Sequence, residues 1–364
     1  MKIKYIISFL ETIAPVNLQE GYDNAGLITG SSAWDCNGII CSLDVTEEVV
    51  LEAIEKNCNC IVAHHPIIFG GLKKINGKNY VEKTIITAIK NDIAIYAIHT
   101  NLDNVLQGVN GKIADMLGLQ NRQILQPKKN ILKRLLTFVP ASHAENVRNA
   151  IFNAGGGHVG NYSECSFNTE GSGTFKAGTG AIPYVGKMGE RHTEYEIKIE
   201  IAFPAWIENN VLTAMFSAHP YEEVAYDIIT LDNLHPQIGS GLTGELPETI
   251  TEEAFLHQLK KIFNLKVIRH TALTGKSPKK VALCGGAGSF LINAAVASGA
   301  DFYITGDIKY HEFFDANGRI VIADIGHYES EQYTIDLLFD ILRGKFLNFA
   351  VQKTGIKTNP VNYF

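Results

Sequence analysis

A short apolar segment at residues 61–69 (IVAHHPIIF) runs directly into two adjacent histidines and a proline. An apolar run of this length, between a helix-like pattern and two glycines, is typical of a parallel strand covered on both faces. Pro66 cannot extend a sheet ladder, so we expect the strand to end at His64 and His65, with both imidazoles at its carboxyl edge. Open α/β sheets bind their ligands at that edge. Two polar residues that only cap a strand would explain the pair equally well.

Strand and helix patterns alternate along the first 125 residues, which predicts a βαβαβ arrangement. We expect buried strands at residues 38–43, 61–65 and 93–98. The third strand ends at His99, and Asp103 follows four residues later, so polar groups again appear where a strand stops. An earlier glycine-flanked loop contains Asp23 and Asn24, for which a role as turn residues is the simpler explanation.

The same alternation returns after residue 234, with strands predicted at residues 280–284, 301–307 and 320–325. Asp307 closes the second of these strands, and His327 and Glu331 follow the third. Residues four apart share one helix face, so this pair would point the same way if a helix begins at His327. A glycine turn at residues 285–288 lacks the lysine of a P-loop and the dinucleotide spacing, which favours tight strand–helix packing over phosphate binding.

The middle segment, residues 126–234, has a different pattern, in which strand–helix–strand occurs twice with a proline after each first strand (Pro140 and Pro204). This is the layout of a split-βαβ, ferredoxin-like unit. Ser142 and Glu145 have the spacing of a capping box at the start of its first helix. We therefore expect an α/β protein, α+β overall, whose core domain is made of residues 1–125 and 235–364 and is interrupted by an inserted domain, 126–234. The glycine-rich loop at 171–189 is long for a compact domain, so we expect it to be functional or mobile.

The length of 364 residues predicts two domains, or one domain that carries a large insertion, and a composition of 46% hydrophobic and 19% charged residues is typical of globular proteins. The formal net charge of -6 gives no electrostatic support for binding nucleic acid or a membrane surface. The N-terminus begins like a signal peptide, but Glu11 interrupts the apolar run, so we expect an amphipathic first helix. The six cysteines lack the spacing of a zinc site or a disulfide framework, and we expect all six to be buried thiols in a reducing cytoplasm.

Candidate ligands thus follow four predicted strands. They are His64 and His65, His99 with Asp103, Asp307, and His327 with Glu331. We expect these strand ends to meet at one edge of a single parallel sheet. Imidazoles mixed with carboxylates, without thiolate, suit Zn, Fe, Mn, Co or Ni. Three histidines and two acids are too many for one catalytic metal, and suit two ions about 3.5–4 Å apart that share a hydroxide nucleophile. Polar residues at loop starts are the alternative explanation.

Several motifs carry a family resemblance: YDNAGL (22–27), AHHPIIF (63–69), AIHTNLDN (97–104), TGDIKYHEF (305–313) and IGHYESE (325–331). Together they resemble the NIF-three-like family, often labelled GTP cyclohydrolase I type 2 homologues. The middle segment is similar to the insertion of the longer bacterial members, which resembles the trimeric P-II and CutA folds. The resemblance implies a toroidal homohexamer with its metal sites facing an internal cavity.

The resemblance also implies roles for individual residues. The dimetal ligands would be His64, His65, Asp103, His327 and Glu331, with Glu331 as the bridge. The residues lining the same cavity, as outer-shell or substrate groups, would be His99, Asp23 and Asn24. Among these, His99 is the candidate for handling a leaving-group proton, because it follows a neighbouring strand and is not in the ligand set.

We therefore expect a cytoplasmic, metal-dependent hydrolase of a small substrate such as a nucleotide or a cyclic amide. GTP is a candidate, although no residue pattern selects it. The alternative is a non-catalytic metal-binding or regulatory protein whose insertion senses a ligand or partner.

Overall fold

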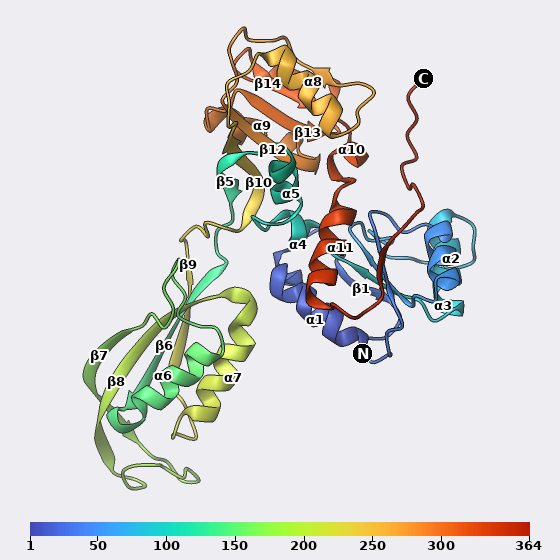
Figure 1. Cartoon of the computed structure of the whole chain (residues 1–364). Coiled ribbons are helices and arrows are strands. Elements are labelled where there is room, and N and C mark those ends of the chain that lie inside the picture. The colour runs from blue at the N-terminus through green and yellow to red at the C-terminus, as the bar shows by residue number, and fades with distance from the viewer. The chain divides into compact units, whose positions relative to one another are not determined.

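The structure, a computed structural model, describes residues 1–364, which divide into two compact units. The first unit joins the two ends of the chain, Met1–Pro127 and Pro236–Phe364, and the second is Lys128–His235. Figure 1 shows the helices and strands of both units. The chain leaves the first unit after Pro127 and returns to it at Pro236. These two points lie close together, because Pro127 pairs with Gly239 in neighbouring antiparallel strands.

The first sheet of the larger unit has five strands in the order β1-β4-β3-β2-β15. Its strands are β1 (Gly26–Thr29), β2 (Ile39–Ser42), β3 (Cys60–Ala63), β4 (Ala94–Ala97) and β15 (Val351–Lys353). All neighbours are parallel except β1, which runs antiparallel to β4. Strands β2, β3 and β4 are buried along their whole length, as their continuous apolar sequences predict.

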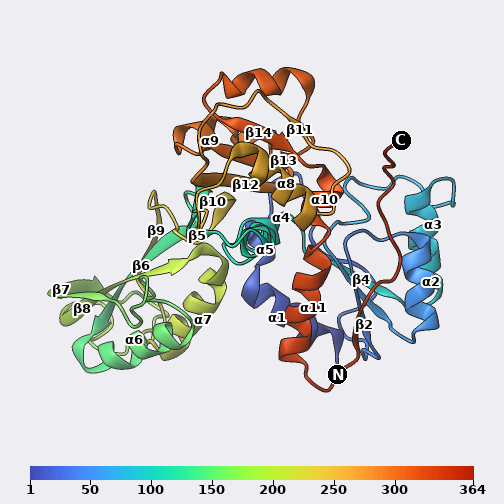
Figure 2. The ribbon, with the colours of Figure 1, turned by 45° about the horizontal axis from the view of Figure 1, so that its top comes forward.

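Helices cover both faces of this sheet, as Figures 1 and 2 show. One face carries α2 (Glu47–Glu55) and α3 (Tyr80–Lys90), and the other carries α1 (Ile3–Ile13) and α11 (Thr334–Lys345). The predicted amphipathic first helix is confirmed, since Ile3, Ile6 and Leu10 form a fully buried stripe on α1. The side chain of Thr46 caps α2 by accepting a hydrogen bond from the backbone N–H of Val49.

The second sheet of the larger unit has six strands in the order β11-β14-β13-β12-β10-β5. Its strands are β5 (Gln120–Pro127), β10 (Gly239–Glu245), β11 (Arg269–His270), β12 (Lys280–Ala287), β13 (Phe302–Gly306) and β14 (Val321–Asp324). The helices between and beside these strands are α4 (Thr100–Asp103), α5 (Val109–Met116), α8 (Glu252–Ile262), α9 (Ile292–Ala297) and α10 (His327–Glu331). Short 3-10 turns complete the unit at Val16–Leu18, Ser289–Leu291 and Tyr310–Ala316.

The expectation of one parallel sheet was wrong. The strands that precede His64 and His99 belong to the first sheet, whereas those that precede Asp307 and His327 belong to the second. The edge strands β1 and β11, each antiparallel to its neighbour, end the two sheets beyond the strands that precede His99 and His327. The candidate ligands therefore converge between two sheets and not along one edge.

The second unit contains one antiparallel sheet in the order β7-β8-β6-β9. Its strands are β6 (Leu132–Pro140), β7 (Phe167–Lys176), β8 (Arg191–Pro204) and β9 (Tyr226–Leu231), and its helices are α6 (Ala144–Asn153) and α7 (Glu208–Ala218). This order is that of a split-βαβ unit, with the first and third strands at the centre. Both helices pack on one face of the sheet around a core that includes Leu135, Ile199 and Phe203.

Two local predictions differ from the structure. The capping box is absent, because Pro140 starts a 3-10 turn that places Ser142 before the helix, where its hydroxyl contacts the ring of His143. Of the six cysteines, five are buried and Cys165 is partly exposed. In the chain as a whole, no helix has the length and hydropathy needed to cross a bilayer.

Candidate metal centre

His64 is fully buried just beyond the end of β3, and its ring has a fixed orientation. Its Nδ1 lies 2.9 Å from the carbonyl oxygen of Ile98, so Nδ1 carries the proton and donates it. Burial, the largest influence, lowers the pKa of His64 to about 4, so the imidazole is neutral near pH 7. Nε2 is therefore an unprotonated lone-pair donor, and it has no hydrogen-bond partner. A buried, unpartnered imidazole nitrogen is costly in a protein core unless it serves as a ligand.

His65 is held in the same way by a carboxylate. Its Nδ1 lies 2.7 Å from Oδ1 of Asp44, and the other oxygen of Asp44 accepts a hydrogen bond from Thr358 at 2.6 Å. Thr358 belongs to the C-terminal segment that follows β15, so both ends of the chain contribute to this arrangement. Histidines that bind metals commonly donate their outer ring N–H to a carboxylate or a carbonyl in this manner.

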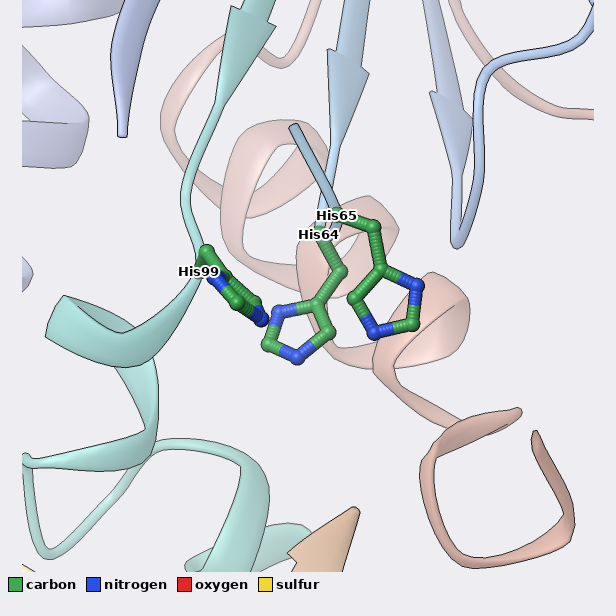
Figure 3. Close-up of side chains that lie close together, drawn as sticks. All are labelled: His64, His65 and His99. Atoms are coloured by element: carbon green, nitrogen blue, oxygen red, sulfur yellow. The ribbon is translucent and has the colours of Figure 1, made fainter. Parts of the chain in front are cut away.

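His99 and His327 repeat the pattern. Nδ1 of His99 lies 2.7 Å from Oδ1 of Asp23, and Nδ1 of His327 lies 2.7 Å from Oδ2 of Asp307. Asp307 adopts a left-handed backbone conformation with a φ of 57°, which is uncommon for a residue with a side chain. In all four histidines Nδ1 contacts an oxygen acceptor, so Nε2 remains available to bind a ligand at the centre of the cluster. Figure 3 shows three of these imidazoles gathered just beyond the ends of β3 and β4.

Glu331 lies at the centre of the cluster, and each of its carboxylate oxygens faces a different set of ligands. Oε2 lies 3.0 Å from Nε2 of His65 and 3.1 Å from Nε2 of His327. Oε1 lies 3.8 Å from Nε2 of His64, which in turn is 3.6 Å from Oδ1 of Asp103. The side chains thus form two groups with spacing suited to a metal ion, His65–His327–Glu331 and His64–Asp103–Glu331. A third such group, His64–His65–His99, places His99 beside them.

The electrostatics of these groups favour a bound cation. Burial, followed by the negative charge of Glu331, raises the pKa of Asp103 well above its usual range. Burial has the same tendency at Glu331, but hydrogen bonds with His327 and His65 outweigh it and hold the pKa of Glu331 well below its usual range. One oxygen of Asp103 is buried without a hydrogen-bond partner. A divalent ion would allow both carboxylates to ionise and would satisfy the unpartnered atoms, so the residues present fit a metal.

The glycine turn at the end of β12 provides space for Glu331. A side chain at Gly286 would place its Cβ 2.3 Å from Oε1 of Glu331. The backbone N–H groups of Gly285, Gly286 and Gly288 donate to the side chains of Asn110, Ser330 and Thr305. None of the three is free to hold a phosphate, so the packing interpretation of this turn is confirmed.

The cluster opens into a cavity of about 1030 Å³ that includes His65, His99, Asp103, His327 and Glu331 in its lining. Asp23 and Asn24 are not among the lining residues. Asp23 lies behind His99 and also accepts a hydrogen bond from the backbone of Thr100, whereas the side chain of Asn24 donates to the carbonyl of Ile68. The structure therefore places Asp23 where it orients His99, and Asn24 where it holds a loop.

No role at the site was predicted for Asp44 or for the Ile98 carbonyl, and Asp307, which was expected among the candidate ligands, lies instead behind His327. Asp44 follows β2 at the same distance as His65 follows β3, so a polar residue after each consecutive strand was the signal that could have identified it. Every residue has a backbone carbonyl, so residue types cannot indicate which carbonyl orients His64.

Fold and site together define an α/β protein with a candidate metal centre of histidine and carboxylate donors between two sheets. The model of the Duf34/NIF3 (NGG1p interacting factor 3) family matches residues 1–360. A protein of Halalkalibacterium halodurans named GTP cyclohydrolase 1 type 2 homolog is 38% identical over 363 residues, which cover 98% of each chain. A protein of the same name from Bacillus subtilis is 39% identical over 89% of this chain and 87% of its own.

Among solved structures, a Bacillus cereus protein related to NIF3 is similar with a TM-score of 0.85 and 39% identity, covering 100% of this chain and 99% of that one. The chain belongs to the Duf34/NIF3 family, and the resemblance noted in its sequence motifs is confirmed.

Proposed function

We propose that this protein binds two divalent metal ions and is a metal-dependent hydrolase of a small substrate. The observation that carries the proposal is the pair of ligand groups that share Glu331, one oxygen for each group. Within that proposal His64 and Asp103 would hold one ion, His65 and His327 would hold the other, and Glu331 would offer one carboxylate oxygen to each. The nitrogen and oxygen donors suit Zn, Fe, Mn, Co or Ni.

The side chains around the centre have different roles in the proposed hydrolysis. Metal ions bound there would supply Lewis acidity and a water ionised near neutral pH. His99 faces the same cavity, and Asp23 holds its Nδ1, so Nε2 is directed inward to take or give the proton of a leaving group. Burial opposes the charge on Asp23, but hydrogen bonds with His99 and Thr100 outweigh it and lower its pKa to about 2. Asp23 therefore remains a carboxylate acceptor for His99 at any physiological pH.

The cysteine in the cavity wall is not an activated nucleophile. Cys284 lines the cavity, but burial raises the pKa of its thiol, and its Sγ–H is directed at the carbonyl of Gly285. A cavity of about 1030 Å³ has room for a nucleotide. GTP is a candidate substrate because relatives are named GTP cyclohydrolase 1 type 2 homolog. Cyclic amides are a second class that the same chemistry could hydrolyse.

The inserted unit and the assembly are further parts of the proposal. We propose that the inserted unit is P-II/CutA-like, which its strand order supports. We also propose a toroidal homohexamer. Large exposed aromatic side chains on the second sheet's loops, Phe290, Tyr310 and Phe314, support an interface there, since they are 62%, 72% and 66% exposed in the single chain. Sedimentation measurements on the purified protein would test the hexamer.

The test of the metal centre compares His64→Ala and Asp103→Ala with His257→Ala, a control on the exposed side of α8. Elemental analysis should show lost metal in the first two variants and wild-type metal in the control. Unchanged metal in both ligand variants would refute the site. The metal-loaded protein is then screened against nucleotides and cyclic amides. Turnover that depends on metal supports a hydrolase. No turnover across the panel supports the alternative, a non-catalytic, regulatory protein, which a separate cavity in the inserted unit also favours.

A further inference from the structure

The inserted unit contains a cavity of its own, about 720 Å³ in volume, on the sheet face opposite its helices. Side chains alternate along β8, so Ile199, Ile201 and Phe203 face the helices and the core. Glu196 and Lys198 face the other way and line the cavity. The volume lies within the range of small-molecule sites.

Two glycines on β7 open the floor of this cavity. Gly171 pairs with Glu196 across the strands, and Gly173 lies two residues further on the same face. A Cβ on Gly173 would lie 2.0 Å from Oε2 of Glu196. Glycine in a strand weakens it, so two on one face indicate a position where something must approach the backbone closely.

Aromatic rings form one wall. The ring of Tyr221 lies 6.2 Å from that of Phe175 and 6.3 Å from that of Tyr184, measured between centroids. The hydroxyl of Tyr221 donates to Oε1 of Glu196 at 2.9 Å, so an aromatic ring and a carboxylate are held side by side. Phe138 adds a fourth ring to the lining.

The charges of the lining are mainly negative. Four carboxylates, Glu170, Glu196, Glu222 and Glu223, line the cavity against two lysines, Lys176 and Lys198. The ammonium of Lys198 is already paired with Glu200, 2.5 Å away. Glu196 is only 8% exposed, and its side chain accepts a hydrogen bond from the hydroxyl of Tyr221.

We propose that this cavity binds an organic cation that carries a substituted ammonium group. Aromatic faces attract such groups through their quadrupoles, and a buried carboxylate supplies the opposite charge. An anionic ligand, such as a nucleotide phosphate, would be repelled by the buried carboxylate of Glu196. Only one lysine of the lining, Lys176, is not already paired with a carboxylate and could offset that repulsion. The proposal concerns the inserted unit alone and does not depend on the metal centre.

The glycine-rich loop between β7 and β8 forms part of the wall, through Ala177, Ala181 and Tyr184. Glu222 holds this loop against the segment between α7 and β9, because Oε1 of Glu222 accepts a hydrogen bond from the backbone N–H of Ile182 at 2.7 Å. A cation that pairs with Glu222 would therefore act directly on the contact that holds the loop. This gives the long loop noted in the sequence a function in binding.

The test uses the full-length, metal-loaded protein and two probes of the same shape, choline and its neutral isostere 3,3-dimethyl-1-butanol. Titration calorimetry should show choline binding at least about tenfold tighter than the isostere. Glu196→Gln keeps the size of the side chain and removes its charge, and should weaken choline binding by about tenfold. Gly173→Ala should weaken it as well by displacing Glu196.

Glu145→Gln is the matched control, because it removes the same charge from an exposed position on α6 outside the cavity. It should bind choline as the wild type does, and thermal unfolding confirms that each variant is folded. Absence of choline binding, equal binding of the isostere, unchanged choline affinity in a folded Glu196→Gln protein, or preferential binding of ATP to this unit would each overturn the proposal.

Discussion

Replacing Asp44 by asparagine should weaken one metal position and leave the other intact. Asp44 touches no proposed ligand except His65, whose Nδ1 lies 2.7 Å from its Oδ1. The asparagine amide can still accept that hydrogen bond, but the negative charge behind the imidazole is lost. His65 belongs to the group with His327 and Glu331, and not to the group of His64 and Asp103.

The expected size of the effect follows from two opposing influences. Loss of a partner behind a metal-binding histidine typically costs 10–100-fold in metal affinity, or about 1.4–2.7 kcal/mol. The same carboxylate also affects the metal-free protein, where burial opposes a charged His65 but hydrogen bonds to Asp44 and Glu331 outweigh it and raise its pKa to about 10. Without the charge of Asp44, protons compete less strongly for His65. We therefore expect the lower end of the range, about tenfold.

The assay titrates the metal-free protein with zinc in competition with a chromophoric chelator, and it should resolve two binding steps in the wild type. In Asp44→Asn one step should move to about tenfold weaker affinity while the other stays in place. Asp35→Asn is the control, because Asp35 pairs only with Lys2 at the surface. Two unchanged steps in Asp44→Asn, or an equal loss at both, would refute the division of the ligands into two groups.

Other variants and conditions test the remaining inferences. Glu331→Gln should lose both metal equivalents, whereas His327→Ala should weaken one, and elemental analysis distinguishes these results. His99→Ala should keep its metal but lose about 10²–10⁴ in turnover of any substrate found, and metal loss instead would make His99 a ligand. Replacing residues 126–234 by a short linker should leave a folded, metal-binding core, and a core that cannot fold would disprove the boundary. Metal affinity should rise with pH up to about the pKa of His65, near 10, because its proton must leave first, and calorimetry in buffers of different ionisation enthalpy should detect the released proton.

The sequence alone determined the strands of the core and the residues that follow them. Apolar runs such as residues 60–63 and 94–97 are buried throughout, and the proline after His65 accompanies the end of β3 as its missing N–H predicts. The helix that begins at His327 and brings Glu331 onto the same face is confirmed as well. These features depend on neighbours a few residues apart, so local pattern is enough to find them.

Tertiary structure alone decided how those strand ends meet. The contact between His65 and Glu331 joins residues 266 positions apart and on different sheets, and no periodicity records which sheet a strand joins. The same holds for the acceptors behind the histidines, Asp44 and Asp307, and for the space that Gly286 leaves beside Glu331. Local sequence sets the conformation of each segment, but the orientation of a ligand depends on hydrogen bonds and packing between segments, which exist only once the two sheets have come together.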